Sequence, residues 1–240
     1  MARRADTASK LSRRQWQRRL ARLRPALLVV AVLATAAFVG WVGLGSSWLA
    51  AEHVTVAGER ALSHRQILAA ADVDLGTPLL RLDLDAVDTR VSALPPVAAV
   101  AVHRAWPNTV AITVTERIPI AAVSRPDSWW VMDKEGVLFR RTPGRVAALP
   151  LVEVGNRAGP SALQEAAAVI AALPAELLSR LQHLTASSMD SLTLTLQDGR
   201  EVRWGSAAQT ERKVQVLSVL LRRPAQVYDV SVPAQPTTAD

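Results

Sequence analysis

The sequence of 240 residues contains no cysteine and only four histidines. Without cysteine the protein has no disulfides, no thiolate metal ligands and no lipid anchor on a cysteine side chain. The histidines are not paired at the spacing of metal ligands; they are His53, His64, His103 and His183. We therefore expect neither a metal ion nor a cofactor.

Motifs that carry catalysis are also missing. The chain has no nucleophile elbow, no phosphate-binding loop and no dinucleotide-binding glycine motif. Its densest acidic cluster, Asp83, Asp85 and Asp88, lacks the glycine and the terminal glutamate of a calcium loop, and helix capping explains it more simply. Because no set of polar side chains converges, we predict no catalytic residues and no small-molecule substrate, and a binding module in place of an enzyme.

Basic charge is unevenly distributed along the chain. Residues 1–24 hold nine of the 28 Lys and Arg residues but only one acid, Asp6. The rest of the chain carries 19 basic and 20 acidic residues and is nearly neutral. A nucleic-acid-binding domain carries its basic residues on the folded surface, so we expect no nucleic-acid partner.

Residues 25–51 contain no charged side chain at all. Residues 26–44 supply about the 20 apolar residues that a helix needs to cross a bilayer, so we predict a single transmembrane helix over residues 25–49. The basic segment before it predicts a cytoplasmic tail over residues 1–24 and extracytoplasmic domains after the span. A cleaved signal peptide is the alternative, since residues 34–36 read Ala-Thr-Ala, but the apolar run continues beyond that point.

The first part after the span has the pattern β-α-α-β-β. Ser63 and Gln66 form a capping box before one helix, and Asp83 or Asp85 caps the next. Strict alternation of apolar and polar residues over 109–115 predicts a half-buried strand. The expected elements are strands at 54–56, 97–104 and 109–115, with helices between the first two and a turn at 106–108.

The second part is richer in strands. Turn residues at 133–136 and Asp198-Gly199 predict two hairpins. Residues 226–232 end the pattern as a last strand, and the polar residues 233–240 are expected to be disordered. The remaining elements are strands at 129–132, 137–139, 151–154, 192–196 and 201–204 and helices at 161–173 and 207–221.

Several short motifs in this order resemble the FtsQ/DivIB family of bacterial cell division proteins. They are V-T-V-A-G at residues 54–58, Arg104 before W-P-N at 106–108, E-R-x-P-x-A at 116–121, D-x-x-G-x-x-F at 133–139 and Y-D-V at 228–230. The resemblance covers nearly the whole chain after residue 25. It implies an α+β protein with a transmembrane helix, a POTRA domain at 52–121 and a β-rich domain with flanking helices at 122–232.

The resemblance also implies a function. The family acts as a non-enzymatic scaffold at the division septum, where it binds FtsB-like and FtsL-like proteins that control septal peptidoglycan synthesis. Its last strand is the docking edge, which corresponds here to Tyr228, Asp229, Val230 and Val232, with Tyr228 as the side-chain anchor. Another membrane-anchored POTRA-type envelope assembly protein is the alternative.

The signature residues are expected to be structural. We predict that Arg104 pairs with Glu116 across the hairpin and that Pro107 preorganises the turn. Trp106 is expected in the core, with a partner contact as the alternative. Arg117 and Pro119 complete the set.

Overall fold

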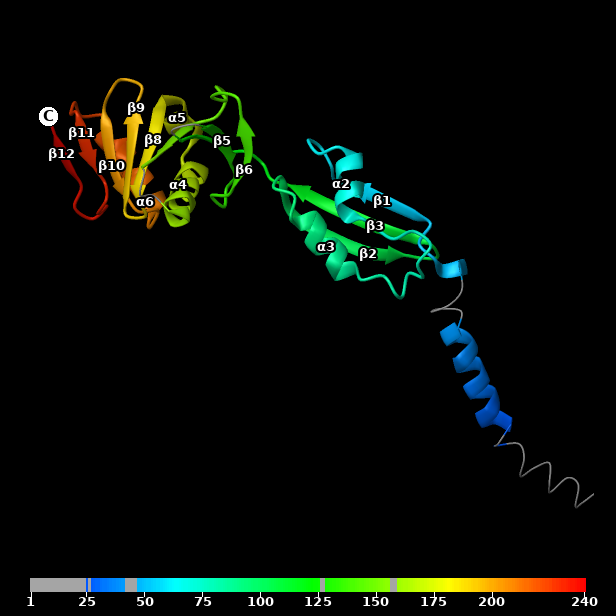
Figure 1. Cartoon of the computed structure of the whole chain (residues 1–240). Coiled ribbons are helices and arrows are strands. Elements are labelled where there is room, and N and C mark those ends of the chain that lie inside the picture. Colours follow the sequence, from blue (N-terminus) through cyan, green and yellow to red (C-terminus); the bar gives the residue numbers. More distant parts are fainter. Residues whose placement is uncertain (1–24, 26, 42–46, 126–127, 156–158) are drawn as a thin grey trace, which may run out of the picture. The chain divides into compact units, whose positions relative to one another are not determined.

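The computed structural model describes the chain except for residues 1–24, 26, 42–46, 126–127 and 156–158 (Figure 1). The expected basic tail at 1–24 lies outside the described residues. By its contacts the chain divides into two compact units, residues 1–91 with 100–114 and residues 92–99 with 115–240.

Residues 27–41 of the expected span form a helix whose apolar side chains are exposed. Within the part of the chain that the structure describes, no helix reaches the length and apolar character required to cross a membrane. The expected span also includes residue 26 and residues 42–46, which lie outside that part. A short 3-10 helix, η1 (Ser47–Leu49), follows.

The first unit is built around a three-stranded sheet in the order β1-β3-β2. Its elements follow the expected β-α-α-β-β order: β1 (His53–Ala57), α2 (His64–Ala71), α3 (Leu84–Ser92), β2 (Val97–Ala105) and β3 (Thr109–Glu116). Strand β1 pairs with β3 in parallel, with His53 opposite Thr109. This arrangement confirms the predicted α+β class of the first domain.

Local sequence signals explain where these elements begin and which face they bury. The Ser63 hydroxyl accepts from the Gln66 N–H and Gln66 reaches back to the Ser63 N–H, so the predicted capping box is formed. At the next helix the Asp83 carboxylate accepts from the Ala86 N–H at 3.0 Å. The apolar positions of β3 are all buried against the helices, namely Val110, Ile112 and Val114.

The second unit is a nine-stranded mixed sheet with three helices. Its strands are β4 (Ala121–Arg125), β5 (Ser128–Met132), β6 (Leu138–Thr142), β7 (Leu151–Val154), β8 (Leu181–Ser188), β9 (Ser191–Leu196), β10 (Glu201–Gly205), β11 (Val227–Asp229) and β12 (Thr237–Ala239). The helices are α4 (Pro160–Ala172), α5 (Ala175–Arg180) and α6 (Thr210–Leu220). The spatial order is β12-β11-β10-β9-β8-β7-β4-β5-β6.

Helix α4 packs against β8 and against α6, and both helices lie over one face of the sheet (Figure 1). The core between the layers is aliphatic with few aromatic side chains; its largest fully buried members include Trp204, Tyr228, Met132, Leu184 and Leu217. The β-rich second domain is therefore confirmed, although β4 and β8 were not predicted, and α6 begins three residues later than expected.

Candidate partner-binding edge

The sheet of the second unit ends in β12, which was not predicted. Strand β12 pairs antiparallel with β11 and forms the outer strand of the sheet (red in Figure 1). The expectation of a disordered tail over residues 233–240 is therefore wrong at Thr237–Ala239. The expected docking strand also needs correction, because β11 has a neighbour on both sides and is not the edge.

Tyr228 is completely buried and is not a surface anchor. Its hydroxyl donates to the Arg223 carbonyl at 2.7 Å and accepts from Arg200 Nη1 at 3.2 Å. The Arg200 guanidinium also lies 5.7 Å from the centre of the tyrosine ring and pairs with Asp198 at 2.6 Å. The prediction that the Tyr228 side chain binds a partner is therefore wrong. Tyr228 belongs to the core, and its hydroxyl group ties β11 to Arg223 and Arg200.

The other three predicted site residues, Asp229, Val230 and Val232, do not form one surface, because β11 ends at Asp229. Val230 is fully buried, whereas Val232 is 57% exposed beyond the strand. The Asp229 carboxylate accepts from the Ser231 N–H at 2.9 Å and from its hydroxyl at 2.6 Å, which turns the chain after β11. The predicted last strand over residues 226–232 therefore ends early, at Asp229, and the structure does not bring Val232 together with Tyr228 and Val230.

Two hydrogen bonds to β10 determine which backbone groups of β11 face which neighbour. The Val230 N–H donates to the Arg203 carbonyl at 3.0 Å, and the Glu201 N–H donates to the Gln226 carbonyl at 2.9 Å. Because backbone groups of successive strand residues point to opposite sides, the backbone of Tyr228 between these two bonds faces β10. The backbones of Val227 and Asp229 face β12.

This alternation continues into β12. Val227 lies opposite Ala239, and Asp229 lies opposite Thr237. In an antiparallel ladder such facing residues exchange their N–H and C=O bonds, so Thr237 and Ala239 are directed towards β11. Thr238, between them, directs its N–H and C=O outward, and all three residues of β12 are exposed. The outer edge thus presents the backbone of Thr238 to a partner strand.

A buried lysine contacts the end of β10, the second strand inward from β12. Lys213 on α6 is 1% exposed, and its Nζ donates to the Trp204 and Ser206 carbonyls, both at 2.8 Å. Burial lowers the pKa of Lys213 below its ordinary value of 10.5. A lysine between the apolar positions of a helix is typical of a solvated face, so the sequence alone does not indicate that Lys213 is buried.

The lowered pKa of Lys213 predicts a pH dependence of stability. Above its folded-state pKa the folded Lys213 is neutral while the unfolded chain still binds a proton, so stability rises with pH up to the ordinary pKa of 10.5. The free energy of unfolding should therefore increase more steeply in this alkaline range for the wild-type protein than for Lys213→Met. Urea titrations at several pH values measure this, with Lys134→Met at an exposed lysine as the control. Equal slopes in wild type and Lys213→Met would contradict it.

One signature residue of the first unit, Trp106, differs from expectation. Arg104 donates to the carbonyls of Leu79 at 2.6 Å and Leu82 at 2.8 Å, so it fastens the loop before α3. The expected core position of Trp106 is wrong, since its side chain is 55% exposed. Pro107 follows in the turn between β2 and β3, as predicted. Glu116 ends β3 and is half-buried, and its pairing with Arg104 stays a prediction.

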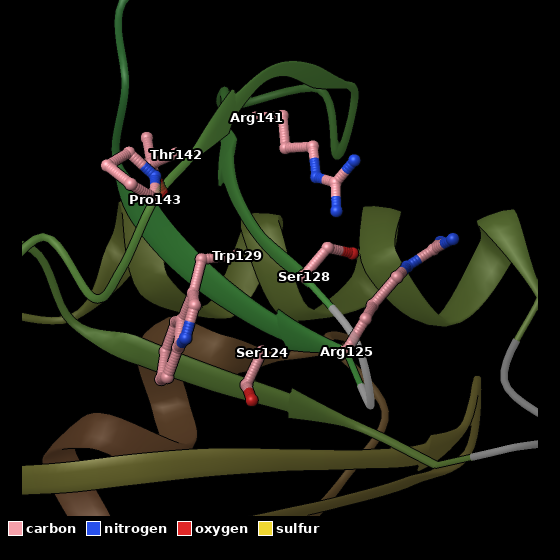
Figure 2. A pocket seen from close by; sticks show the side chains of 7 residues that line it. All are labelled: Ser124, Arg125, Ser128, Trp129, Arg141, Thr142 and Pro143. Atoms are coloured by element: carbon pink, nitrogen blue, oxygen red, sulfur yellow. The ribbon is translucent and has the colours of Figure 1, made fainter.

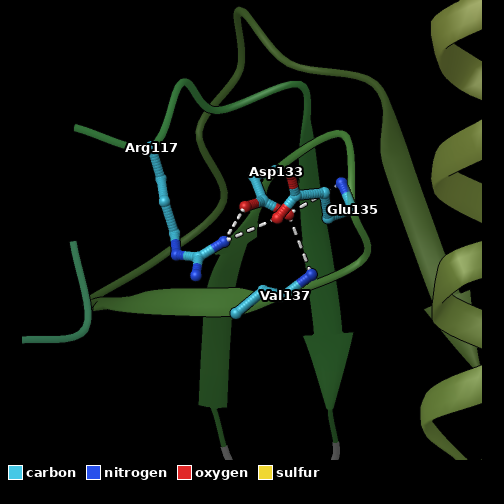
Figure 3. A network of polar contacts seen from close by, with 4 residues as sticks. All are labelled: Arg117, Asp133, Glu135 and Val137. Carbon is cyan, nitrogen blue, oxygen red and sulfur yellow. Dashed lines mark hydrogen bonds and ion pairs between the residues drawn. The ribbon is translucent and has the colours of Figure 1, made fainter. Parts of the chain in front are cut away.

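Arg117 joins two of the motifs that the sequence showed only separately (Figure 3). Its Nη1 contacts the buried carboxylate of Asp133 and, at 3.2 Å, the exposed Glu135. The second oxygen of Asp133 accepts from the N–H groups of Glu135 and Val137, both at 2.9 Å. The structural role expected for Arg117 is thus specific: it fixes the hairpin turn to the segment before β4, where half-buried Pro119 also lies.

An open cavity of about 750 Å³ lies by the β4–β5 hairpin and β6 (Figure 2). Arginine, tryptophan and hydroxyl side chains line it: Ser124, Arg125, Ser128, Trp129, Arg141, Thr142 and Pro143. None of these residues is a carboxylate or an imidazole that could serve as a general base. Among the described residues, no group of three or more His, Cys, Asp or Glu side chains is placed to hold a metal ion.

Together these features define a class of protein: a POTRA-type module followed by a β domain whose sheet ends in an accessible strand. Residues 49–117 match the POTRA domain, FtsQ-type, and residues 121–232 match the cell division protein FtsQ/DivIB, C-terminal domain. The chain belongs to the FtsQ/DivIB family of bacterial cell division proteins.

Curated relatives support this assignment. The chain is 38% identical over 234 residues to a cell division protein FtsQ of Streptomyces bingchenggensis, covering 92% of this chain and 88% of that one. It is 39% identical over 191 residues to the FtsQ of Mycolicibacterium smegmatis, covering 79% of this chain but 57% of that longer protein. The extracytoplasmic domain of DivIB from Geobacillus stearothermophilus aligns with 50% of this chain at 18% identity and a TM-score of 0.36, too low to add to the assignment.

Proposed function

We propose that this protein is a non-enzymatic scaffold of the division machinery that binds FtsB-like and FtsL-like proteins outside the cytoplasmic membrane. Residues 25–49 anchor it by a single span with the N-terminus inside, and the protein gathers at the septum, where its partners control peptidoglycan synthesis. The uneven basic charge before the uncharged run supports this orientation. Its family membership supports a role in division.

The observation that carries the binding function is the outward backbone of β12. An outer strand of three exposed residues, two of them threonine, offers hydrogen-bonding groups that a partner strand satisfies by extending the sheet. The docking edge is therefore one strand beyond the predicted one. Tyr228, Asp229 and Val230 support it from within, whereas Val232 is exposed beyond β11. Recognition of a partner strand needs only backbone hydrogen bonds and no catalytic group, and β12 consists of two threonines and an alanine.

Proline at Thr238 should weaken partner binding and leave the domain folded. It removes the outward N–H and adds bulk at the docking edge, while the bonds of Thr237 and Ala239 to β11 remain. One lost hydrogen bond and the accompanying clash should weaken binding at least about tenfold. The measurement is co-purification of the full chain with co-expressed FtsB-like and FtsL-like proteins, and the melting temperature reports folding.

Thr238→Ala is the matched control, because it shortens the same side chain but keeps the N–H, and it should bind like the wild type. Val230→Pro would be uninformative, since it deletes the internal bond to Arg203. Normal binding by a folded Thr238→Pro variant would move the docking surface away from β12.

A further inference from the structure

Large apolar side chains are exposed at one end of the first unit. Trp48 is 84% exposed, Leu75 57%, Trp106 55% and Leu80 48%. These four are the large exposed apolar residues of this unit among its described residues after 47. Two exposed tryptophans beside two exposed leucines call for a partner, because a solvated surface gains nothing from such side chains.

Hydrogen bonds bring the three segments that carry these side chains together. The Leu79 N–H donates to the Leu49 carbonyl at 2.8 Å, which places Leu80 near η1. Arg104, two residues before Trp106, holds the Leu79 carbonyl at 2.6 Å from the other side. The apolar end is thus a built surface that joins η1, the loop before α3 and the β2–β3 turn.

Further contacts fix the β2–β3 turn to the chain next to Trp48. The Glu52 N–H donates to the Asn108 carbonyl at 2.9 Å, and the Asn108 side chain donates to the Glu52 carboxylate at 2.7 Å. Trp48 and Pro107 line the same open hollow of about 480 Å³. The Glu52 carboxylate is therefore hydrogen-bonded to the β2–β3 turn. The side chains of Trp48 and Pro107 border the hollow.

The chain itself indicates what covers this end. Trp48 follows the apolar helix at residues 27–41 by seven residues, which span at most about 25 Å when fully extended. A unit tethered so closely to a membrane span must lie near the bilayer surface. Tryptophan favours the boundary between lipid headgroups and hydrocarbon.

We propose that this end of the POTRA-type unit lies on the outer surface of the membrane, with Trp48, Leu80 and Trp106 inserted among the lipid headgroups. The inference rests on the single span of the proposed function. It adds a second, peripheral contact with the lipid surface, which restricts how far the unit tilts away from the membrane.

The absence of cysteine permits a direct test. Leu80→Cys places one nitroxide label on this end, and Val219→Cys places one on α6, where the native side chain is 61% exposed. The full chain is reconstituted into vesicles of phosphatidylcholine and phosphatidylglycerol. The ratio of label accessibility to oxygen over accessibility to a water-soluble nickel complex should be several-fold higher at position 80 than at 219. Adding Trp106→Ser to Leu80→Cys should lower that ratio towards the value at 219.

Equal ratios at the two positions in vesicle-bound protein would overturn the membrane contact and leave the span intact. Shielding of position 80 from both reagents would also overturn it, since another protein surface would then cover this end. If the full chain does not float with the vesicles after alkaline carbonate washing, the proposed span itself fails, and this outcome is distinct from the other two.

Discussion

Replacing Gly136 with alanine should destabilise the second unit by roughly 2–5 kcal/mol, the sum of left-handed strain and overpacking. Gly136 has a φ of +79°, and a Cβ there would lie 2.6 Å from the backbone N and 2.7 Å from the Cα of Gln164. The turn therefore packs directly on the backbone of α4, which cannot move without disturbing the core. Urea denaturation followed by tryptophan fluorescence measures the loss.

Gly199→Ala separates the two contributions to this loss. Gly199 has a similar φ of +85°, but a Cβ there meets nothing within 4 Å. Its replacement should cost only the left-handed strain, about 1–2 kcal/mol. A Gly136→Ala variant no less stable than Gly199→Ala would show that α4 yields to the extra methyl group.

Asp133→Ala should cost about 3–5 kcal/mol of unfolding free energy, as is usual when one partner of a buried ion pair is removed. Asp133 is 3% exposed, and its carboxylate serves Arg117 as well as the N–H groups of Glu135 and Val137. Its removal leaves the half-buried guanidinium of Arg117 without its buried partner. The same denaturation experiment measures the effect.

Glu135→Ala is the matched control for Asp133. Glu135 contacts the same guanidinium at 3.2 Å, but its side chain is 59% exposed, so the loss should stay within about 1 kcal/mol. The double variant Arg117→Met, Asp133→Ala should lose less than the two single variants combined, because the charge and its partner are removed together. Additive losses would argue against a coupled pair.

Local patterns in the sequence were sufficient for the elements of the first unit. Helix capping by Ser63 and Asp83 and the alternation of β3 depend only on residues close together in the sequence. Both caps and the buried face of β3 are found as predicted. The prediction for Trp106 was wrong. A tryptophan beside a strand is apolar enough for the core, but a single sequence does not say whether the turn that carries it faces the core or the solvent.

The candidate site was harder to predict, for a different reason. The resemblance placed Tyr228 and Val230 in a docking strand, but the sequence does not say that their side chains are buried. Strand β12 gave no apolar signal, since Thr237 and Thr238 are held by backbone pairing and not by burial. The contact of Arg117 with Asp133 joins residues 16 positions apart, and no local rule connects them.

The three-residue length of β12 limits how tightly any strand can be held there through the backbone alone. Only Thr238 directs both its N–H and its C=O outward, and a net contribution of about 0.5–1.5 kcal/mol for each bond gives at most about 3 kcal/mol. A millimolar complex already needs about 4 kcal/mol. The edge therefore sets the register and direction of an incoming chain, and a long-lived assembly must draw its affinity from side-chain contacts beside it. Two copies of this protein joined only edge to edge would separate readily.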